Sequence, residues 1–212
     1  MKNKKLILIA GGTASGKSFV AGQMSKQYID NSKGVTLITI DNYYKTLAQM
    51  KVELHSEVNW DHPDTFDWKR LKKDVDKLLK NKSIKLRTYN YGLGNYGEEE
   101  REVLSEEIII IEGIYALYDK ELRDKADILI YVDVDSDIRM IRRIKRDSEG
   151  RYSHNFDPNE FMVKWEEVIK LMHNKYIQPT KEYADIIVKN NKELNNKQKS
   201  SLIELLQTLV VK

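Results

Sequence analysis

The sequence contains no cysteine among its 212 residues. This absence excludes a disulfide framework, a zinc site with thiolate ligands and a cysteine nucleophile. A chain without cysteine fits a reducing compartment, so we expect a cytoplasmic location.

Charge of one sign and long apolar runs are also lacking. The chain has 36 Lys and Arg against 33 Asp and Glu, a formal net charge of +3, which gives no electrostatic reason to expect nucleic acid or a membrane as the main partner. The first apolar run, residues 6–10, is too short for a signal-peptide core or a membrane span. The length allows one full core, and we expect a single domain over residues 1–212.

What the sequence does contain is the string Gly-Gly-Thr-Ala-Ser-Gly-Lys-Ser at residues 11–18. It matches the phosphate-binding pattern G-x-x-x-x-G-K-[ST], and it lies between an apolar run and a helical pattern, as that motif requires. Gly11 and Gly16 would let backbone N–H groups approach phosphate oxygens. Lys17 would contact the β- and γ-phosphates, and Ser18 would hold Mg²⁺. An ordinary glycine-rich turn is the alternative. The residues expected to bind the nucleotide are Gly11, Gly12, Thr13, Ala14, Ser15, Gly16, Lys17, Ser18 and Phe19.

Apolar runs that predict strands alternate with helical patterns along the chain. The expected strands cover residues 6–10, 35–40, 108–111, 128–132 and, at an edge, 186–188. The expected helices cover residues 17–28 and 66–79, begin near residues 136 and 158, and end the chain at 202–209. A β-hairpin is predicted at about 83–104 and a lid at about 147–158. This alternation around a phosphate loop predicts an α/β fold, a three-layer α/β/α arrangement with a central parallel sheet and a projecting hairpin.

Two acidic residues follow predicted strands, Asp41 after residues 35–40 and Glu112 after residues 108–111. Ligands of open α/β sheets bind at the carboxyl ends of the strands, so both acids are candidates for chemistry. Asp41 could instead cap the next helix. The helix beginning near residue 136 is expected to turn Ile138, Ile141 and Ile144 inward. Four arginines of this helix would then face solvent or a phosphate: Arg139, Arg142, Arg143 and Arg146.

A phosphate loop alone is compatible with a kinase, a GTPase or a motor. The guanine-reading pattern N-K-x-D is missing, since none of the five Asn-Lys pairs continues that way. Phosphoryl transfer to an alcohol needs a base, an acid near Mg²⁺ and cations on the migrating group. Arg146 and Arg151 precede a predicted helix start at Asp157, which favours a hinged lid that limits transfer to water.

The chain resembles the uridine kinase (uridine–cytidine kinase) family of P-loop kinases over nearly its whole length. The phosphate loop is shared by many families, whereas the strings D-x-x-Y-Y, D-H-P and R-R-I-K-R-D in this order are specific. The matching segments are residues 11–18, 41–44, 61–63, 89–91, 112–114, 142–147 and 179–185.

The resemblance implies transfer of the γ-phosphoryl group of ATP (or GTP), with Mg²⁺, to the 5′-hydroxyl of a pyrimidine ribonucleoside, giving UMP or CMP in pyrimidine salvage. By resemblance, Asp41 would be the general base, Ser18 and Glu112 would hold Mg²⁺, and Asp61 with Arg143 would bind the ribose hydroxyls. A homotetramer is suggested by the family alone. The implied catalytic residues are Asp41, Lys17, Arg146 and Arg151, and the implied acceptor-binding residues are Tyr44, Trp60, Asp61, Tyr89 and Arg143.

Three positions depart from the family pattern. Gly94 stands where the hairpin carries a histidine that reads the pyrimidine edge, Lys164 and Trp165 replace Gln-Tyr, and the segment ending at Arg151 lacks one lid arginine. A site with fewer hydrogen bonds to the base discriminates less. Two alternatives therefore stay open: a P-loop kinase for another hydroxylated metabolite, such as a different nucleoside, a sugar phosphate or a vitamin precursor, and a catalytically weak nucleotide-binding regulatory protein.

Overall fold

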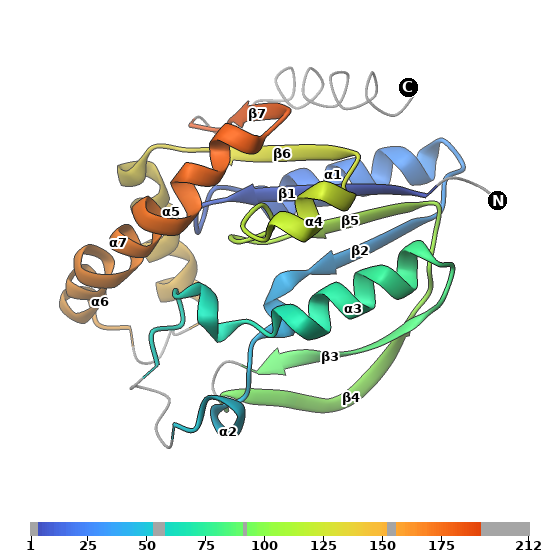
Figure 1. Ribbon diagram of the computed structural model, residues 1–212. Coiled ribbons are helices and arrows are strands. Elements are labelled where there is room, and N and C mark those ends of the chain that lie inside the picture. The colour runs from blue at the N-terminus through green and yellow to red at the C-terminus, as the bar shows by residue number, and fades with distance from the viewer. Residues whose placement is uncertain (1–3, 53–57, 91–92, 152–155, 192–212) are drawn as a thin grey trace.

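The computed structural model of the protein describes residues 4–52, 58–90, 93–151 and 156–191. Its central feature is a parallel sheet whose strands follow the order β2-β5-β1-β6-β7. Figure 1 shows these strands in the middle of the molecule, with β7 at one edge as predicted. The strands are β1 (Lys5–Gly11), β2 (Val35–Thr39), β5 (Ile108–Glu112), β6 (Ile128–Asp133) and β7 (Ile186–Lys189).

Alternate residues of the central strands enter two separate hydrophobic cores. Leu8 of β1 and Ile111 of β5 face one core, whereas their neighbours Ile7 and Ile110 face the other. All five residues of β5 are buried, which confirms that the four isoleucines form a strand covered on both faces.

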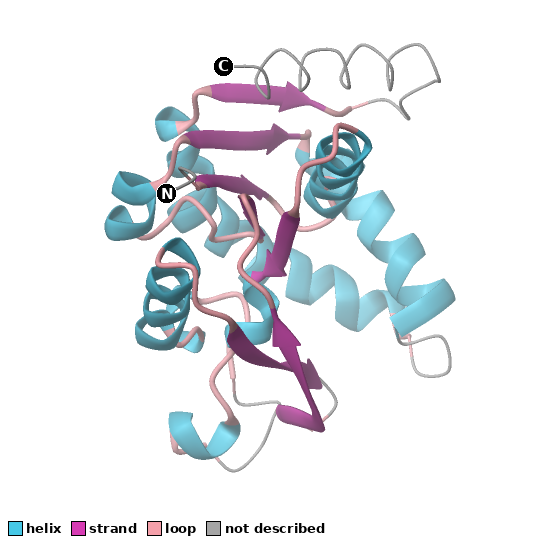
Figure 2. Cartoon of the chain, turned by 90° about the vertical axis from the view of Figure 1, so that its right-hand side faces the viewer, coloured by secondary structure: helices cyan, strands magenta, loops and turns pink. Residues whose placement is uncertain are grey.

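Helices cover both faces of this sheet (Figure 2). Helix α1 (Lys17–Asp30) packs Val20 and Met24 into one core, and α3 (Trp68–Leu79) packs Leu71 and Val75 into the other. The predicted three-layer α/β/α arrangement is therefore confirmed. The remaining helices are α2 (Leu47–Met50), α4 (Lys120–Lys125), α5 (Ser136–Arg146), α6 (Pro158–Lys164) and α7 (Lys170–Met172).

The predicted hairpin is a separate antiparallel sheet of β3 (Ile84–Asn90) and β4 (Asn95–Val103), at the bottom of Figure 1. The sequence alternates at Ile84, Leu86 and Thr88, but the strand register shifts between Arg87 and Tyr89. Thr88 is consequently exposed and Tyr89 is buried. The irregularity turns an aromatic ring inward that strict alternation would have left in solvent.

The chain after α5 remains helical with several irregular turns. A π-helical turn covers Asp147–Arg151, and two more, Trp165–Ile169 and His173–Ile177, flank α7. The predicted helix start at Asp157 is confirmed, because its carboxylate accepts hydrogen bonds from the backbone N–H groups of Asn159 and Glu160. The expected helix at 202–209 and lid residues 152–155 lie outside the described residues. The single-domain organisation stays a prediction.

Helix α5 contradicts the predicted orientation of its side chains. Ile141, expected to face inward, is 62% exposed, whereas Arg139, expected to face outward, is only 2% exposed. The predicted helix is present, but the other two isoleucines that were expected to face inward, Ile138 and Ile144, are only half-buried. Arg139 occupies the buried position because this part of the helix packs against the phosphate loop, where a Cβ on Gly12 would lie 2.7 Å from Arg139 Nη1.

Across the described residues we find no helix with the length and apolar character needed to cross a bilayer.

Candidate active site

The phosphate loop connects β1 to α1 and is held from behind by a distant residue. Gly16 has a left-handed backbone with φ of 90°, and a Cβ there would lie 2.6 Å from Asn190 Nδ2. That Asn190 amide donates a hydrogen bond to the Ser15 carbonyl at 2.8 Å. Glycine is therefore required at position 16 by both conformation and space. Asn190 directly follows β7, so the strand-end argument that identified Asp41 would also have found it.

The arginines of α5 form a cluster beside the loop. Arg143 donates to Thr13 Oγ1 at 2.6 Å and to Asp147 at 2.7 Å, and Arg146 donates to Asp147 at 3.0 Å. Burial acts to raise the pKa of the Asp147 carboxyl, but the two guanidinium groups hold that pKa below its ordinary value. Asp147 thus fixes two of the predicted phosphate- and ribose-binding arginines near the loop.

Lys17, Glu112 and Asp41 act on one another through their charges. Burial lowers the pKa of the Lys17 ammonium, and the carboxylates of Glu112 and Asp41 oppose that shift. Burial raises the pKa of Glu112, opposed by Lys17 and reinforced by Asp41. Three predicted residues from three separate elements are therefore brought together at the carboxyl ends of β2 and β5.

Ser18 and Glu112 fit the predicted magnesium site. Ser18 Oγ donates to Glu112 Oε1 at 3.1 Å. The other carboxylate oxygen, Glu112 Oε2, is buried and has no hydrogen-bond partner among the described residues. A hydroxyl beside a carboxylate with a spare oxygen is a donor set suited to Mg²⁺ carried on a nucleotide. No group of three or more histidine and carboxylate ligands is found in the described part of the chain.

Asp41 is not a helix cap. It lies in a 3₁₀ turn, Ile40–Tyr43, and its backbone N–H donates to the hydroxyl of Thr39, which caps that turn. The structural alternative raised from the sequence is therefore wrong. The Asp41 carboxylate lies within electrostatic range of both Lys17 and Asp61.

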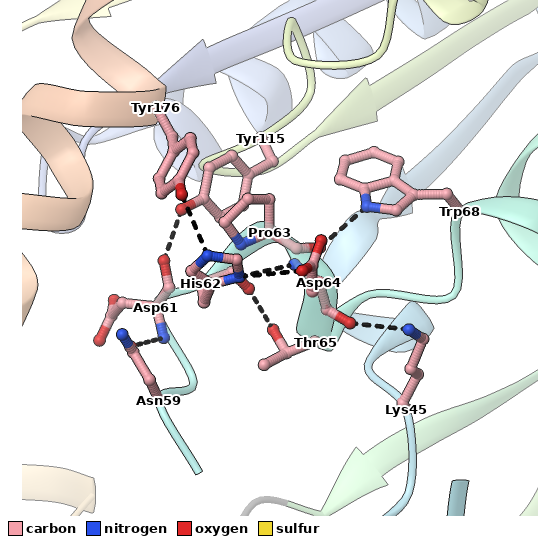
Figure 3. A network of polar contacts seen from close by, with 10 residues as sticks. All are labelled: Lys45, Asn59, Asp61, His62, Pro63, Asp64, Thr65, Trp68, Tyr115 and Tyr176. Carbon is pink, nitrogen blue, oxygen red and sulfur yellow. Dashed lines mark hydrogen bonds and ion pairs between the residues drawn. The ribbon is translucent and has the colours of Figure 1, made fainter. Parts of the chain in front are cut away.

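The backbone around Asp61 is fixed by the network in Figure 3. Tyr115 donates its hydroxyl to the Asp61 carbonyl. His62 accepts the Asp64 N–H at Nδ1, 3.2 Å away, and its Nε2 is 3.1 Å from the Tyr176 hydroxyl. His62 is thus a turn residue that begins the 3₁₀ turn Pro63–Thr65. The Asp61 carboxylate points away from these bonds in the view.

The electrostatic surroundings of Asp61 include two of the predicted residues. Burial raises the pKa of the Asp61 carboxyl, and the charges of Arg143 and Lys164 oppose that rise. The Asp61 carboxylate therefore lies within electrostatic range of Arg143. Lys164, one of the departures from the family pattern, acts on the same carboxylate.

Tyr44, Trp60 and Tyr89 are brought into one aromatic cluster. The Tyr44 ring centroid lies 5.7 Å from that of Trp60 and 5.3 Å from that of Tyr89. The Tyr44 hydroxyl donates to the Trp60 carbonyl and the Tyr89 hydroxyl to the Lys45 carbonyl. That these three rings contact the nucleobase of an acceptor stays a prediction.

Gly94, at the turn of the hairpin, contacts α2. Its φ is +57°, and a Cβ would lie 2.7 Å from Leu47 Cγ. The Leu47 N–H also donates to the Gly94 carbonyl at 3.1 Å. The Leu47 side chain therefore occupies the space that the Cβ of any other residue at position 94 would need.

Three predicted residues remain. Phe19, at the start of α1, is 39% exposed. Arg146 is held by Asp147, as described above. Arg151 ends a helical turn, but its side chain lies outside the described part of the structure.

Sequence comparisons show the family, and structure comparisons show the fold. A sequence model of the phosphoribulokinase/uridine kinase family matches residues 6–195. The chain is 38% identical to the uridine kinase of Clostridium perfringens over 190 residues, covering 89% of this chain and 88% of that one. It is 40% identical to the uridine kinase of Bacillus subtilis over 187 residues, covering 88% and 86%.

Among solved structures, the phosphoribulokinase from Rhodobacter spheroides superimposes with a TM-score of 0.66 at 17% identity, covering 89% of this chain and 71% of that one. This likeness confirms the fold. The sequence matches go further, because they extend over most of both chains at close to 40% identity. The chain therefore belongs to the phosphoribulokinase/uridine kinase family and is a uridine kinase-like phosphotransferase.

Proposed function

We propose that the protein transfers the γ-phosphoryl group of ATP to the 5′-hydroxyl of a pyrimidine ribonucleoside, uridine or cytidine, and so serves pyrimidine salvage. The position of Asp41 carries this proposal. Asp41 lies just after β2, whose last residue Thr39 pairs with Glu112 of β5, and its charge acts on Lys17, Glu112 and Asp61. A base between a triphosphate site and a second polar site is what transfer to an alcohol requires.

In the proposed reaction Asp41 accepts the proton of the 5′-hydroxyl as the oxygen attacks the γ-phosphorus. The bond between that phosphorus and the β,γ-bridging oxygen breaks, and ADP leaves. Lys17 and Arg146, together with Arg151 of the lid, would supply positive charge for the oxygens of the migrating group. The Asp147 carboxylate accepts hydrogen bonds from Arg143 and Arg146 and holds both guanidinium groups in place.

Ser18 and Glu112 would hold Mg²⁺, as their oxygens suggest. The ion would neutralise charge on the β- and γ-phosphates when bound. Within the protein, the Ser18 hydrogen bond orients the Glu112 carboxylate, leaving its second oxygen available.

On the acceptor side, Asp61 and Arg143 would bind the ribose 2′- and 3′-hydroxyls. The fixed backbone of Asp61 supports this role, because Tyr115 holds its carbonyl and His62 anchors the following turn. The aromatic cluster of Tyr44, Trp60 and Tyr89 would contact the flat base.

The test is ADP release measured with uridine and cytidine against a reaction without acceptor. We expect rates far above that background with both nucleosides and lower rates with their 2′-deoxy forms. A rate with uridine and cytidine equal to the background would overturn the pyrimidine assignment.

A kinase for an anionic acceptor is the second candidate, and Lys164 favours it. This exposed lysine acts on the Asp61 carboxylate and adds a cation to the acceptor side. Thermal-shift measurements with nucleosides and with phosphorylated sugars, each alongside an ATP analogue, separate the two. Stabilisation by sugar phosphates alone would replace the nucleoside assignment and leave the phosphotransfer chemistry in place.

A further inference from the structure

Arg139 is a buried cation behind the phosphate loop. Its side chain is 2% exposed, and its guanidinium lies over the Trp165 ring at 5.6 Å from the centroid. Nε donates to the Val134 carbonyl at 3.2 Å, but Nη1 is buried and has no hydrogen-bond partner among the described residues.

The guanidinium also lacks a carboxylate of its own within the described chain. Asp133 acts on Arg139 through its charge, but the Asp133 carboxylate is already paired with Lys181 at 2.7 Å. Burial lowers the pKa of Arg139, which shows that the surrounding protein disfavours its charge. Burying an ion without a partner is unfavourable, so a charge kept in such a place calls for a reason.

The unpartnered nitrogen lies directly behind Gly12. A Cβ on Gly12 would be 2.7 Å from Arg139 Nη1 and 2.9 Å from His173 Nδ1. His173 is 6% exposed, and burial together with the charge of Arg139 lowers its pKa to about 4, so it is neutral at physiological pH. Its Nε2 lies 3.1 Å from Gln178 Oε1, which leaves Nδ1 without a partner. Arg139 is therefore the charged member of this buried pair.

We propose that Arg139 is an electrostatic positioning residue, a buried positive charge behind Gly12 that is neutralised only when the polyphosphate of a nucleotide occupies the loop. It contacts the loop and not the ligand, and acts through its charge. The inference rests on nucleotide binding at this loop, but it does not depend on the identity of the acceptor.

This arrangement predicts opposite effects on stability and on binding. Without ligand, the buried charge is a cost, and an apolar residue of similar length should be tolerated or stabilising. With ligand, the charge attracts the phosphates across a thin layer of backbone, where the effective dielectric constant is low. Methionine at position 139 should therefore weaken polyphosphate binding without lowering the stability of the empty protein.

The experiment measures binding of ATP and of inorganic tripolyphosphate by calorimetry in the full-length protein, with no acceptor present. Arg139→Met should weaken both ligands by about tenfold or more, as expected for one charge at close range. Arg139→Lys should retain most of the affinity. Lys145→Met, which removes a positive charge from an exposed position of the same helix, is the matched control and should bind close to wild type.

Thermal unfolding without ligand supplies the second readout. We expect Arg139→Met to unfold at or above the wild-type temperature. Wild-type affinity of this variant for tripolyphosphate would overturn the proposal. Loss of ATP binding with unchanged tripolyphosphate binding would also overturn it, because Arg139 would then contact the base. If Arg139→Met does not fold, Arg139→Gln, which can keep the hydrogen bond to Val134, is measured in the same way.

Because no acceptor enters this test, its outcome is separate from that of the proposed function. Inactivity with uridine and cytidine would reject the acceptor assignment and leave the role of Arg139 intact.

Discussion

The two ends of the candidate site are built differently. At the phosphate end, polar side chains from distant elements bind the loop directly: Asn190 at Ser15, Arg143 at Thr13 and Glu112 at Ser18. At the acceptor end, tyrosine hydroxyls donate to backbone carbonyls while their rings pack on one another, as for Tyr44 and Tyr89.

The difference bears on what each end can tolerate. A hydrogen bond between a distant side chain and the loop depends on the identity of both residues, and a carboxylate oxygen that can bind a metal depends on the acid that carries it. A ring packed against other rings depends mostly on shape and apolar area, so related aromatic or apolar side chains can replace it. We therefore expect the chemistry of phosphate transfer to resist sequence change more strongly than the choice of acceptor does.

Replacement of Asp41 should have the largest effect, because Asp41 is the proposed base of the transfer step. Asp41→Asn removes the proposed base and should lower kcat by about 10²- to 10⁴-fold, with little change in the KM for ATP. Steady-state kinetics with saturating uridine measure this. Asp30→Asn, an exposed acid at the end of α1, is the control. Near-normal turnover in Asp41→Asn would remove the base assignment.

Replacement of Asp61 should affect only the acceptor end. Asp61→Asn exchanges a charged hydrogen-bond acceptor for a neutral amide, and should lower kcat/KM for uridine roughly ten- to hundredfold. The loss for 2′-deoxyuridine should be smaller, and the KM for ATP should not change. An equal loss for both nucleosides would show that Asp61 does not read the ribose 2′-hydroxyl.

Replacement of Glu112 should show how much its buried, ionised carboxylate lowers the free energy of unfolding. Burial raises the pKa of Glu112 in the folded protein, so its ionised form opposes folding above that pKa and has no effect below the ordinary pKa of glutamate. Glu112→Gln should therefore raise the unfolding temperature at neutral pH, by about 2–4 °C for each kcal/mol gained.

Thermal unfolding as a function of pH checks the sign of this effect. The gain should shrink as the pH falls through the raised pKa and disappear in acid, and Mg²⁺-dependent activity should be lost throughout. A gain that persists unchanged in acid would contradict an origin in the Glu112 charge.

Replacement of Tyr176 should have the smallest effect. Tyr176→Phe removes one hydroxyl beside His62 and should cost about 0.5–1.5 kcal/mol of stability. We expect a modest rise in the KM for uridine and none in that for ATP. Tyr183→Phe, at a half-exposed ring, is the control. A larger rise in the KM for ATP than for uridine would reverse the assignment of this contact to the acceptor end.

The phosphate end was also the more predictable from sequence. Its loop is one contiguous string, and the strand that precedes it and the strand that carries Glu112 are apolar on both faces. Strand ends in a parallel sheet meet at one edge, which brought Asp41 and Glu112 together without further information.

The prediction failed where tertiary packing, and not the polarity of the side chains, decided which residues of a helix are buried. Periodicity placed Ile141 inside and Arg139 outside, because apolar residues are ordinarily buried and charged ones exposed. The structure reverses them, since the face of α5 that meets Gly12 carries Arg139. A separate feature that no residue in the sequence marks is the shift in strand register between Arg87 and Tyr89, which turns the Tyr89 ring inward.

The central claim is that Asp41 joins the two ends. Its most direct test is a crystal structure with uridine and a non-hydrolysable ATP analogue bound together. We predict an Asp41 carboxylate oxygen within about 3.2 Å of the uridine 5′-oxygen, with that oxygen in line with the γ-phosphorus. A nucleoside whose 5′-hydroxyl lies away from Asp41, with another group in hydrogen-bond reach, would contradict the account.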